Sequence, residues 1–163
     1  MDETERVHAV ASAVMDPELP VVTIGELGIV REATISDGRA IVTITPTYSG
    51  CPAMDVIRAD IVSALRREGF GDVEIRTVYA PAWTTDWVSD SGRRKLAAGG
   101  IAPPGAAAVG RRPVLPLLPP PAPVCPRCES VAVAEISRFG PTACTSLWRC
   151  LDCAEPFEHM KAH

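Results

Sequence analysis

The residues of this chain best suited to chemistry are its six cysteines, four of which form two Cys-x-x-Cys pairs. CPRC lies at residues 125–128 and CLDC at residues 150–153, with 21 residues between them (150 − 128 − 1). Two such knuckles place four sulfurs around one tetrahedral ion. We therefore predict a metal site and favour zinc over iron, because structural ribbons are usually zinc sites. Its ligands would be Cys125, Cys128, Cys150 and Cys153.

The segment that carries these knuckles is small. About 40 residues cannot bury a sufficient apolar core, so metal ligation should supply the free energy of folding. The pattern predicts a hairpin of residues 131–138 and 145–149, and a third short strand at residues 156–160. Cys144 lies inside the hairpin, away from both knuckles, and is expected to be a buried small residue.

Cys51 is the second candidate, in the stretch TPTYSGCP at residues 45–52. A β-branched strand leads into a turn and then into a helix that is predicted to begin at about Cys51, with Pro52 in its first turn. A thiol at the positive end of a helix is favoured as the thiolate, which attacks electrophiles and binds metals. A small buried core residue is the alternative interpretation.

Other polar candidates are fewer. Asp16 and Glu18 flank a proline in DPELP, which fits either a solvated helix exit or a functional acidic pair. The histidines match no ligand spacing, and we expect His159 and His163 at the surface.

Several elements must position Cys51. The hydrophobic periodicity predicts a small α+β sheet with a helix crossover. Since the second strand reaches the third through a helix, these strands should be parallel, with Cys51 at their carboxyl ends. The predicted elements are a helix capped by Thr4 (4–15), a hairpin (29–35 and 39–45, turning at Asp37-Gly38), a helix (from about 51, with Thr47, Ser49 and Gly50 ahead of it) and a strand (73–78).

Two tryptophans follow in PAWTTDW, residues 81–87. We expect Trp83 and Trp87 to pack against the sheet end, and Thr85 or Asp86 to cap a short helix that runs through Leu96. This segment also has the position to form the rim of the Cys51 site.

The composition predicts three parts: an α+β domain (1–99), a linker (100–123) and a metal-binding ribbon (124–163). Residues 103–123 contain eight prolines, which favour an extended, semi-rigid linker.

Net charge and termini restrict the function. The net charge of −4 and the lack of a basic cluster argue against nucleic acid. The N-terminus carries acids where a signal peptide needs bases, and no apolar run reaches membrane-spanning length. We expect a cytoplasmic protein, in which cysteines serve as ligands or reactive thiols rather than disulfides.

Taken together, DPELP with LGIV and TPTYSGCP resemble the MIP-eighteen, or SufT-like, group of iron–sulfur cluster assembly factors. PAWTTDW and the ribbon narrow the resemblance to the PaaD family, accessory proteins encoded with the phenylacetyl-CoA epoxidase of aerobic phenylacetate degradation. The resemblance implies an α+β assembly domain in which Cys51 handles iron or a cluster and Asp16 and Glu18 match the acidic motif. The implied client is the epoxidase, either its iron–sulfur reductase or its di-iron oxygenase.

The leading hypothesis is thus a maturation factor, not an enzyme, in which Cys51 transiently holds iron or a cluster. Because clusters generally take four ligands, either a homodimer pairs two Cys51 residues or client thiols complete the shell. A docking subunit without metal transfer is the alternative. A cysteine-nucleophile enzyme would need a general base, and no histidine lies near the motif in sequence.

Overall fold

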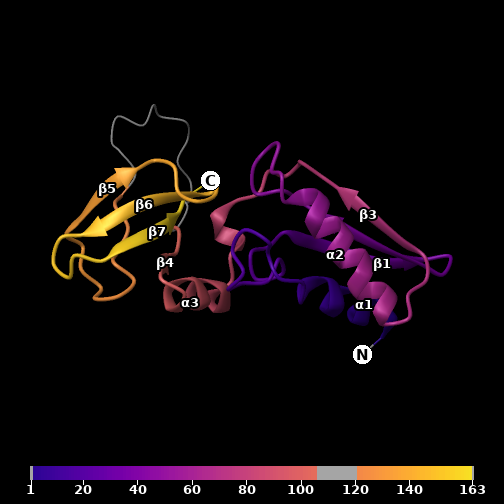
Figure 1. Ribbon diagram of the computed structural model, residues 1–163. Helices are drawn as coiled ribbons and strands as arrows, with labels where there is room; N and C mark the ends of the chain where they lie inside the picture. Colours follow the sequence, from indigo (N-terminus) through magenta and orange to yellow (C-terminus); the bar gives the residue numbers. More distant parts are fainter. Residues whose placement is uncertain (1, 106–120, 163) are drawn as a thin grey trace. The chain divides into compact units, whose positions relative to one another are not determined.

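The structure is a computed structural model that describes residues 2–105 and 121–162 (Figure 1). The chain divides into two compact units, residues 1–92 and 93–163. Most of the predicted linker, residues 106–120, lies outside the described residues, and the domain limits set from composition stay predictions. In the part of the chain that is described, no helix combines the length and apolarity that crossing a membrane requires.

The N-terminal unit has the predicted helix, hairpin, helix, strand order. Its sheet has the strand order β1-β2-β3, in which β1 and β2 are antiparallel and β2 and β3 are parallel. The predicted α+β fold and its parallel crossover are therefore confirmed. The elements are α1 (Glu3–Ser12), β1 (Val30–Ser36), β2 (Arg39–Ile44), α2 (Met54–Arg67) and β3 (Val73–Thr77).

The core of this unit lies between the sheet and its two helices. Figure 1 shows α1 and α2 side by side over one face of the sheet, and both contact it. The central strand β2 buries Val42 and Ile44, and α2 buries Ile57 and Ile61. Burial of such side chains is the main source of stability for this unit.

The start and end of α1 differ from the prediction. Asp2, not Thr4, caps the helix: its Oδ1 accepts the Glu5 N–H at 2.7 Å, and the Glu5 carboxylate accepts the Asp2 N–H at 2.8 Å. The helix ends at Ser12 rather than Met15, because Met15 instead forms a β-bridge with Thr23. A tertiary contact thus overrides the local helical pattern.

The tryptophan segment packs as expected. Trp83 is buried, and its Nε1 donates a hydrogen bond to the Leu27 carbonyl at 2.9 Å. The Arg31 guanidinium lies 3.5 Å from the centre of the Trp87 ring. A 3-10 helix (Thr85–Trp87) and α3 (Asp90–Ala98) follow.

The predicted caps of this segment are wrong. The Thr84 hydroxyl accepts the Asp86 N–H ahead of the 3-10 helix, and the Ser89 hydroxyl accepts the Gly92 N–H in the first turn of α3. The stretch from Thr85 to Ala98 forms two separate helices rather than one, so each has its own cap.

The C-terminal unit is a four-stranded sheet of order β4-β7-β6-β5. The predicted hairpin and third strand are confirmed as β5, β6 and β7, which pair antiparallel in turn. The short strand β4 was not predicted, and it pairs parallel to β7 through Ile101 and Ala102. The strands are β4 (Ile101–Ala102), β5 (Val133–Ser137), β6 (Thr145–Cys150) and β7 (Pro156–Met160).

Candidate functional site

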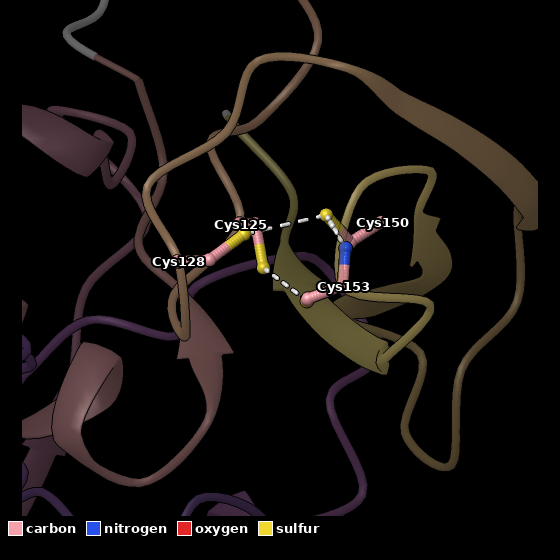
Figure 2. Close-up of side chains that lie close together, drawn as sticks. All are labelled: Cys125, Cys128, Cys150 and Cys153. Atoms are coloured by element: carbon pink, nitrogen blue, oxygen red, sulfur yellow. Dashed lines mark hydrogen bonds between the residues drawn. The ribbon is translucent and has the colours of Figure 1, made fainter.

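The four knuckle cysteines converge in the C-terminal unit (Figure 2). Their sulfur atoms all lie within 4.8 Å of one another, with Cys125 and Cys153 3.8 Å apart and Cys128 and Cys150 3.5 Å apart. Metal–sulfur bonds of about 2.3 Å in a tetrahedron place sulfurs roughly 3.8 Å apart. These separations exceed a disulfide bond of about 2.05 Å, and all four cysteines are free. The donor set and spacing therefore fit a tetrahedral S₄ metal site.

The two knuckles fold in the same way, which sets the four sulfurs. The Cys125 N–H donates to the Ser130 carbonyl and the Cys150 N–H to the Glu155 carbonyl, both at 2.9 Å. The residue after each knuckle, Glu129 or Ala154, has a positive φ, 60° and 62° respectively. This left-handed residue turns the chain back, so that backbone N–H groups point at the sulfurs.

Side chains join the knuckles at their exposed rims. Arg127 pairs with Glu155 at 2.6 Å, and the Ser130 hydroxyl donates to Asp152 at 2.5 Å. Exposed pairs of this kind contribute little stability singly. They connect the first knuckle to the second and so help to fix the register between them.

The charge state of the sulfurs follows from their surroundings. The N–H groups of Cys153 and Asp152 point at the Cys150 sulfur and lower its pKa to about 6. The Ser130 N–H acts in the same direction on Cys128, but hydrogen bonds from neighbouring cysteines and burial outweigh it and raise the Cys128 pKa to about 12. Without a cation the four sulfurs cannot all be thiolates at neutral pH, so metal binding must release protons.

The remaining cysteine of this unit, Cys144, is buried, as expected. Its Sγ lies 3.1 Å from the Thr142 hydroxyl, and its carbonyl accepts the Lys161 N–H. His159, expected at the surface, is half-buried beside Ser146 and Trp148, and burial lowers the pKa of its imidazole. His163 lies outside the described residues.

Cys51 lies in a turn ahead of α2, not in the helix. The helix begins at Met54, and no side chain caps it at Ala53, so Thr47 and Ser49 do not supply the capping that their position ahead of the helix suggested, whereas Gly50 takes part in the turn. The Cys51 N–H donates to the Tyr48 carbonyl at 3.4 Å, and Gly50 between them has a φ of +81°. This turn leaves the Cys51 thiol half-buried at the carboxyl end of β2.

The expectation that Cys51 is a thiolate is also wrong. Burial is the largest cause and raises the pKa of Cys51, while the Ala53 N–H and the Tyr48 hydroxyl act to lower it. The carboxylates of Glu18 and Asp16 raise it further. Because the helix begins beyond Cys51, its macrodipole does not overcome burial and the neighbouring acids.

Because the charges of Glu18 and Asp16 raise the pKa of Cys51, the acidic motif must lie near the thiol. Asp16 is buried, unlike a solvated helix exit, and its Oδ1 accepts the N–H groups of Glu18 at 2.9 Å and Leu19 at 2.7 Å. Burial raises the pKa of Asp16. Among the described residues, however, only the four ribbon cysteines bring three or more ligand atoms close enough together to hold one metal ion.

Tyr48 is the neighbour of Cys51 that sequence reasoning missed. Its backbone carbonyl accepts the turn hydrogen bond from the Cys51 N–H, and its hydroxyl acts to lower the pKa of the Cys51 thiol. The signal was present in the sequence, because Tyr48 precedes Cys51 by three residues, the spacing of a β-turn, and Gly50 suits its third position.

We expect Cys51 to react slowly with iodoacetamide near neutral pH, and its rate to keep rising above the usual thiol range, because its pKa is raised. Glu18→Gln removes a nearby negative charge and should speed the reaction roughly twofold to tenfold at about pH 7.5, whereas Tyr48→Phe should slow it. Peptide mass spectrometry measures alkylation at Cys51 alone. Glu32→Gln is the control for net charge, and a Cys51 that reacts faster than a free cysteine would contradict the expectation.

Two family models match separate parts of the chain. A family model described as iron-sulfur cluster assembly protein matches residues 4–77, and one described as PaaD zinc beta ribbon domain matches residues 116–161. A protein of Escherichia coli K12, named as a putative 1,2-phenylacetyl-CoA epoxidase subunit, is 41% identical over 159 residues, which cover 98% of this chain and 93% of that protein.

Other relatives match the N-terminal part. An Fe-S protein maturation auxiliary factor of Porphyromonas gingivalis is 33% identical over 85 residues, covering 51% of this chain and 80% of that protein. The crystal structure of a domain of unknown function, DUF59, from Bacillus anthracis aligns with a TM-score of 0.52 and 31% identity, covering 59% of this chain and 91% of that one. The α-β-β-α-β unit therefore has the fold of that domain.

Proposed function

Since this chain belongs to the PaaD family, with an iron–sulfur assembly domain followed by a zinc ribbon, we propose that it is a maturation factor for a phenylacetyl-CoA epoxidase. It would act in the cytoplasm and would not itself be an enzyme. The observation that carries the proposal is a partly exposed Cys51 beside two acids, in a domain related to Fe-S protein maturation factors. The client class comes from the name of the Escherichia coli relative.

In this proposal Cys51 binds iron or a cluster only transiently. The raised pKa keeps the thiol protonated at rest, so an arriving cation displaces the proton, and the carboxylates of Asp16 and Glu18 favour positive charge nearby. One thiol is a poor cluster ligand, because clusters generally take four. Ligands from the client or from a second copy would complete the shell and favour onward transfer.

The ribbon has a structural part in this proposal. Cys125, Cys128, Cys150 and Cys153 would hold zinc, with iron as the alternative ion. Zinc in a closed S₄ site supplies folding free energy and no open coordination position. The ribbon would then present a stable surface to the reductase or the oxygenase.

The test is to co-express the epoxidase subunits with the wild-type chain or with Cys51→Ser, and to measure iron and sulfide per purified client. We expect client loading to fall several-fold with Cys51→Ser, whereas Cys144→Ser, a matched loss of a thiol elsewhere, should leave it unchanged. Equal loading with the wild type and Cys51→Ser would remove the maturation role. Unfolding curves of each variant show whether the fold is retained.

A docking role within the epoxidase complex is the second candidate. It is favoured by the name of the Escherichia coli relative, which describes an epoxidase subunit, and by the thiol form of Cys51. A docking protein should remain bound to the purified epoxidase in fixed stoichiometry. Epoxidase activity would then survive Cys51→Ser but not Cys150→Ser, which removes a ribbon ligand.

A further inference from the structure

Three strands of five or more residues lie at sheet edges in the described parts of the chain: β1, β3 and β5. The pairing of β1 shifts register between Val30 and Glu32, and that of β5 between Glu135 and Ser137. Such bulges discourage further pairing at an exposed edge. The pairing of β3 is regular throughout, and the strand contains no proline or glycine. It is therefore the edge best prepared to accept another strand.

In the described part of the chain, the backbone groups of β3 that do not pair with β2 lie at alternate residues. Toward β2, the Ala40 N–H donates to the Asp72 carbonyl and the Val78 N–H donates to the Ile44 carbonyl. Because N–H and C=O groups alternate between the two sides of a strand, those of Val73, Ile75 and Thr77 face away from β2. Ile75 is at the centre of this outward-facing row.

The core is incompletely closed along the same edge. Val73, Ile75 and Thr77 are in register with Ala40, Val42 and Ile44 and share their face of the sheet. The three β2 residues are buried, whereas the three β3 residues are only half-buried. An added strand would cover the apolar side chains that remain accessible here.

The charges of β3 are symmetric about Ile75. Glu74 and Arg76 lie on the other face of the sheet, with side chains 34% and 55% exposed, and they contact each other at 2.7 Å. In an antiparallel pairing of two β3 strands centred on Ile75, Glu74 would lie opposite the partner's Arg76, and Arg76 opposite the partner's Glu74. Opposite charges at directly opposed positions stabilise a strand pair, and like charges destabilise it.

We propose that β3 pairs with β3 of a second copy of this chain, antiparallel and about a two-fold axis at Ile75. The outward groups of Ile75 then bond those of the partner's Ile75, and those of Val73 bond the partner's Thr77. The arrangement is isologous, as in most homodimers. One strand pair with its flanking side chains falls in the small, transient class of interface, below about 1,200 Å².

This dimer has a consequence for Cys51. The antiparallel arrangement puts the carboxyl ends of the two β3 strands at opposite ends of the shared edge. Cys51 follows the carboxyl end of β2, which is parallel to β3, so the two thiols lie at opposite ends as well. They cannot bind one cluster together, and the client must supply the missing ligands.

The experiment is analytical ultracentrifugation of the zinc-loaded full chain from about 5 to 500 µM, a span that resolves weak self-association. Glu74→Arg or Arg76→Glu alone places like charges opposite each other, and each should raise the dimer dissociation constant roughly tenfold or more. An equimolar mixture of the two variants restores both opposite-charge pairs and should associate again, as should the chain that carries both changes. Glu32→Arg, the same reversal on β1, is the matched control and should associate like the wild type.

Recovery of association in the mixture would also show that both single variants fold. Cys51→Ser should dimerise like the wild type, which separates this interface from any thiol-bridged or cluster-bridged pair. Loss of client loading and loss of the dimer are thus independent results. The proposal would be overturned by a wild type that stays monomeric over the whole range, even if its β3 binds a client peptide. Single charge reversals that leave the dissociation constant unchanged would overturn it as well.

Discussion

Cys150→Ser should abolish zinc binding and unfold the sheet of the C-terminal unit while α1 and α2 remain folded. One apolar cluster of that unit includes two of the ligands: its buried members are Ala102, Cys125, Cys150 and Phe157. Structural zinc contributes roughly 10–16 kcal/mol in small zinc domains at neutral pH. So few residues bury too little apolar surface to replace a contribution of that size.

Elemental analysis and hydrogen exchange measure this effect. We expect zinc per chain to fall from about one to near zero, and the amides of β6 and β7 to lose protection, because four thiolates normally complete a structural site. Chelation of the wild type should give the same exchange pattern. Cys144→Ser is the matched control and should keep both zinc and protection. Retained protection of β6 in the metal-free chain would show that the ribbon folds without metal.

Gly28→Ala should lower the free energy of unfolding of the N-terminal unit by about 3 kcal/mol. Gly28 has a φ of +71°, and a Cβ placed there would lie 2.6 Å from the Trp87 Cβ and 2.8 Å from the Trp87 carbonyl oxygen. A left-handed alanine costs about 1–2 kcal/mol, and an overlap in a packed region a further 1–3 kcal/mol. The backbone around Gly28 would have to move away from Trp87.

Urea unfolding, followed by the exchange protection of α2, measures this change. Gly38→Ala is the matched control, since Gly38 also has a positive φ, +78°, but an added Cβ meets nothing within 4 Å. The control should therefore lose only about 1 kcal/mol, the cost of the backbone conformation. Equal losses in both variants would mean that the contact with Trp87 does not limit stability.

The architecture was predictable because it follows from short-range patterns. The two Cys-x-x-Cys pairs specify a cluster by spacing alone, and the structure brings their sulfurs within 4.8 Å. Alternation in the β1–β2 hairpin and the Asp37-Gly38 turn specify an antiparallel pair, which is observed. The crossover rule then makes β3 parallel to β2.

The chemistry of Cys51 was not predictable from such patterns. The sequence pattern places the thiol at the start of a helix, whereas burial raises its pKa, helped by two carboxylates from a loop more than thirty residues earlier in the chain. Strand β4 was not predicted for the same reason. Its two residues form a strand only because they pair with β7, which is distant in the sequence. Short elements and charge states depend on tertiary neighbours that one sequence does not reveal.

The pairing of Ile101 with Glu158 affects the order in which the protein can form during synthesis. Residues 1–92 form a compact unit, and domains generally fold as units, the N-terminal one first during synthesis. Strand β4 has no pairing partner until residues 156–160 have been translated, and the second knuckle must emerge before any ion has all four sulfurs. The N-terminal domain of the nascent chain can thus be folded while the ribbon still lacks part of its ligand set.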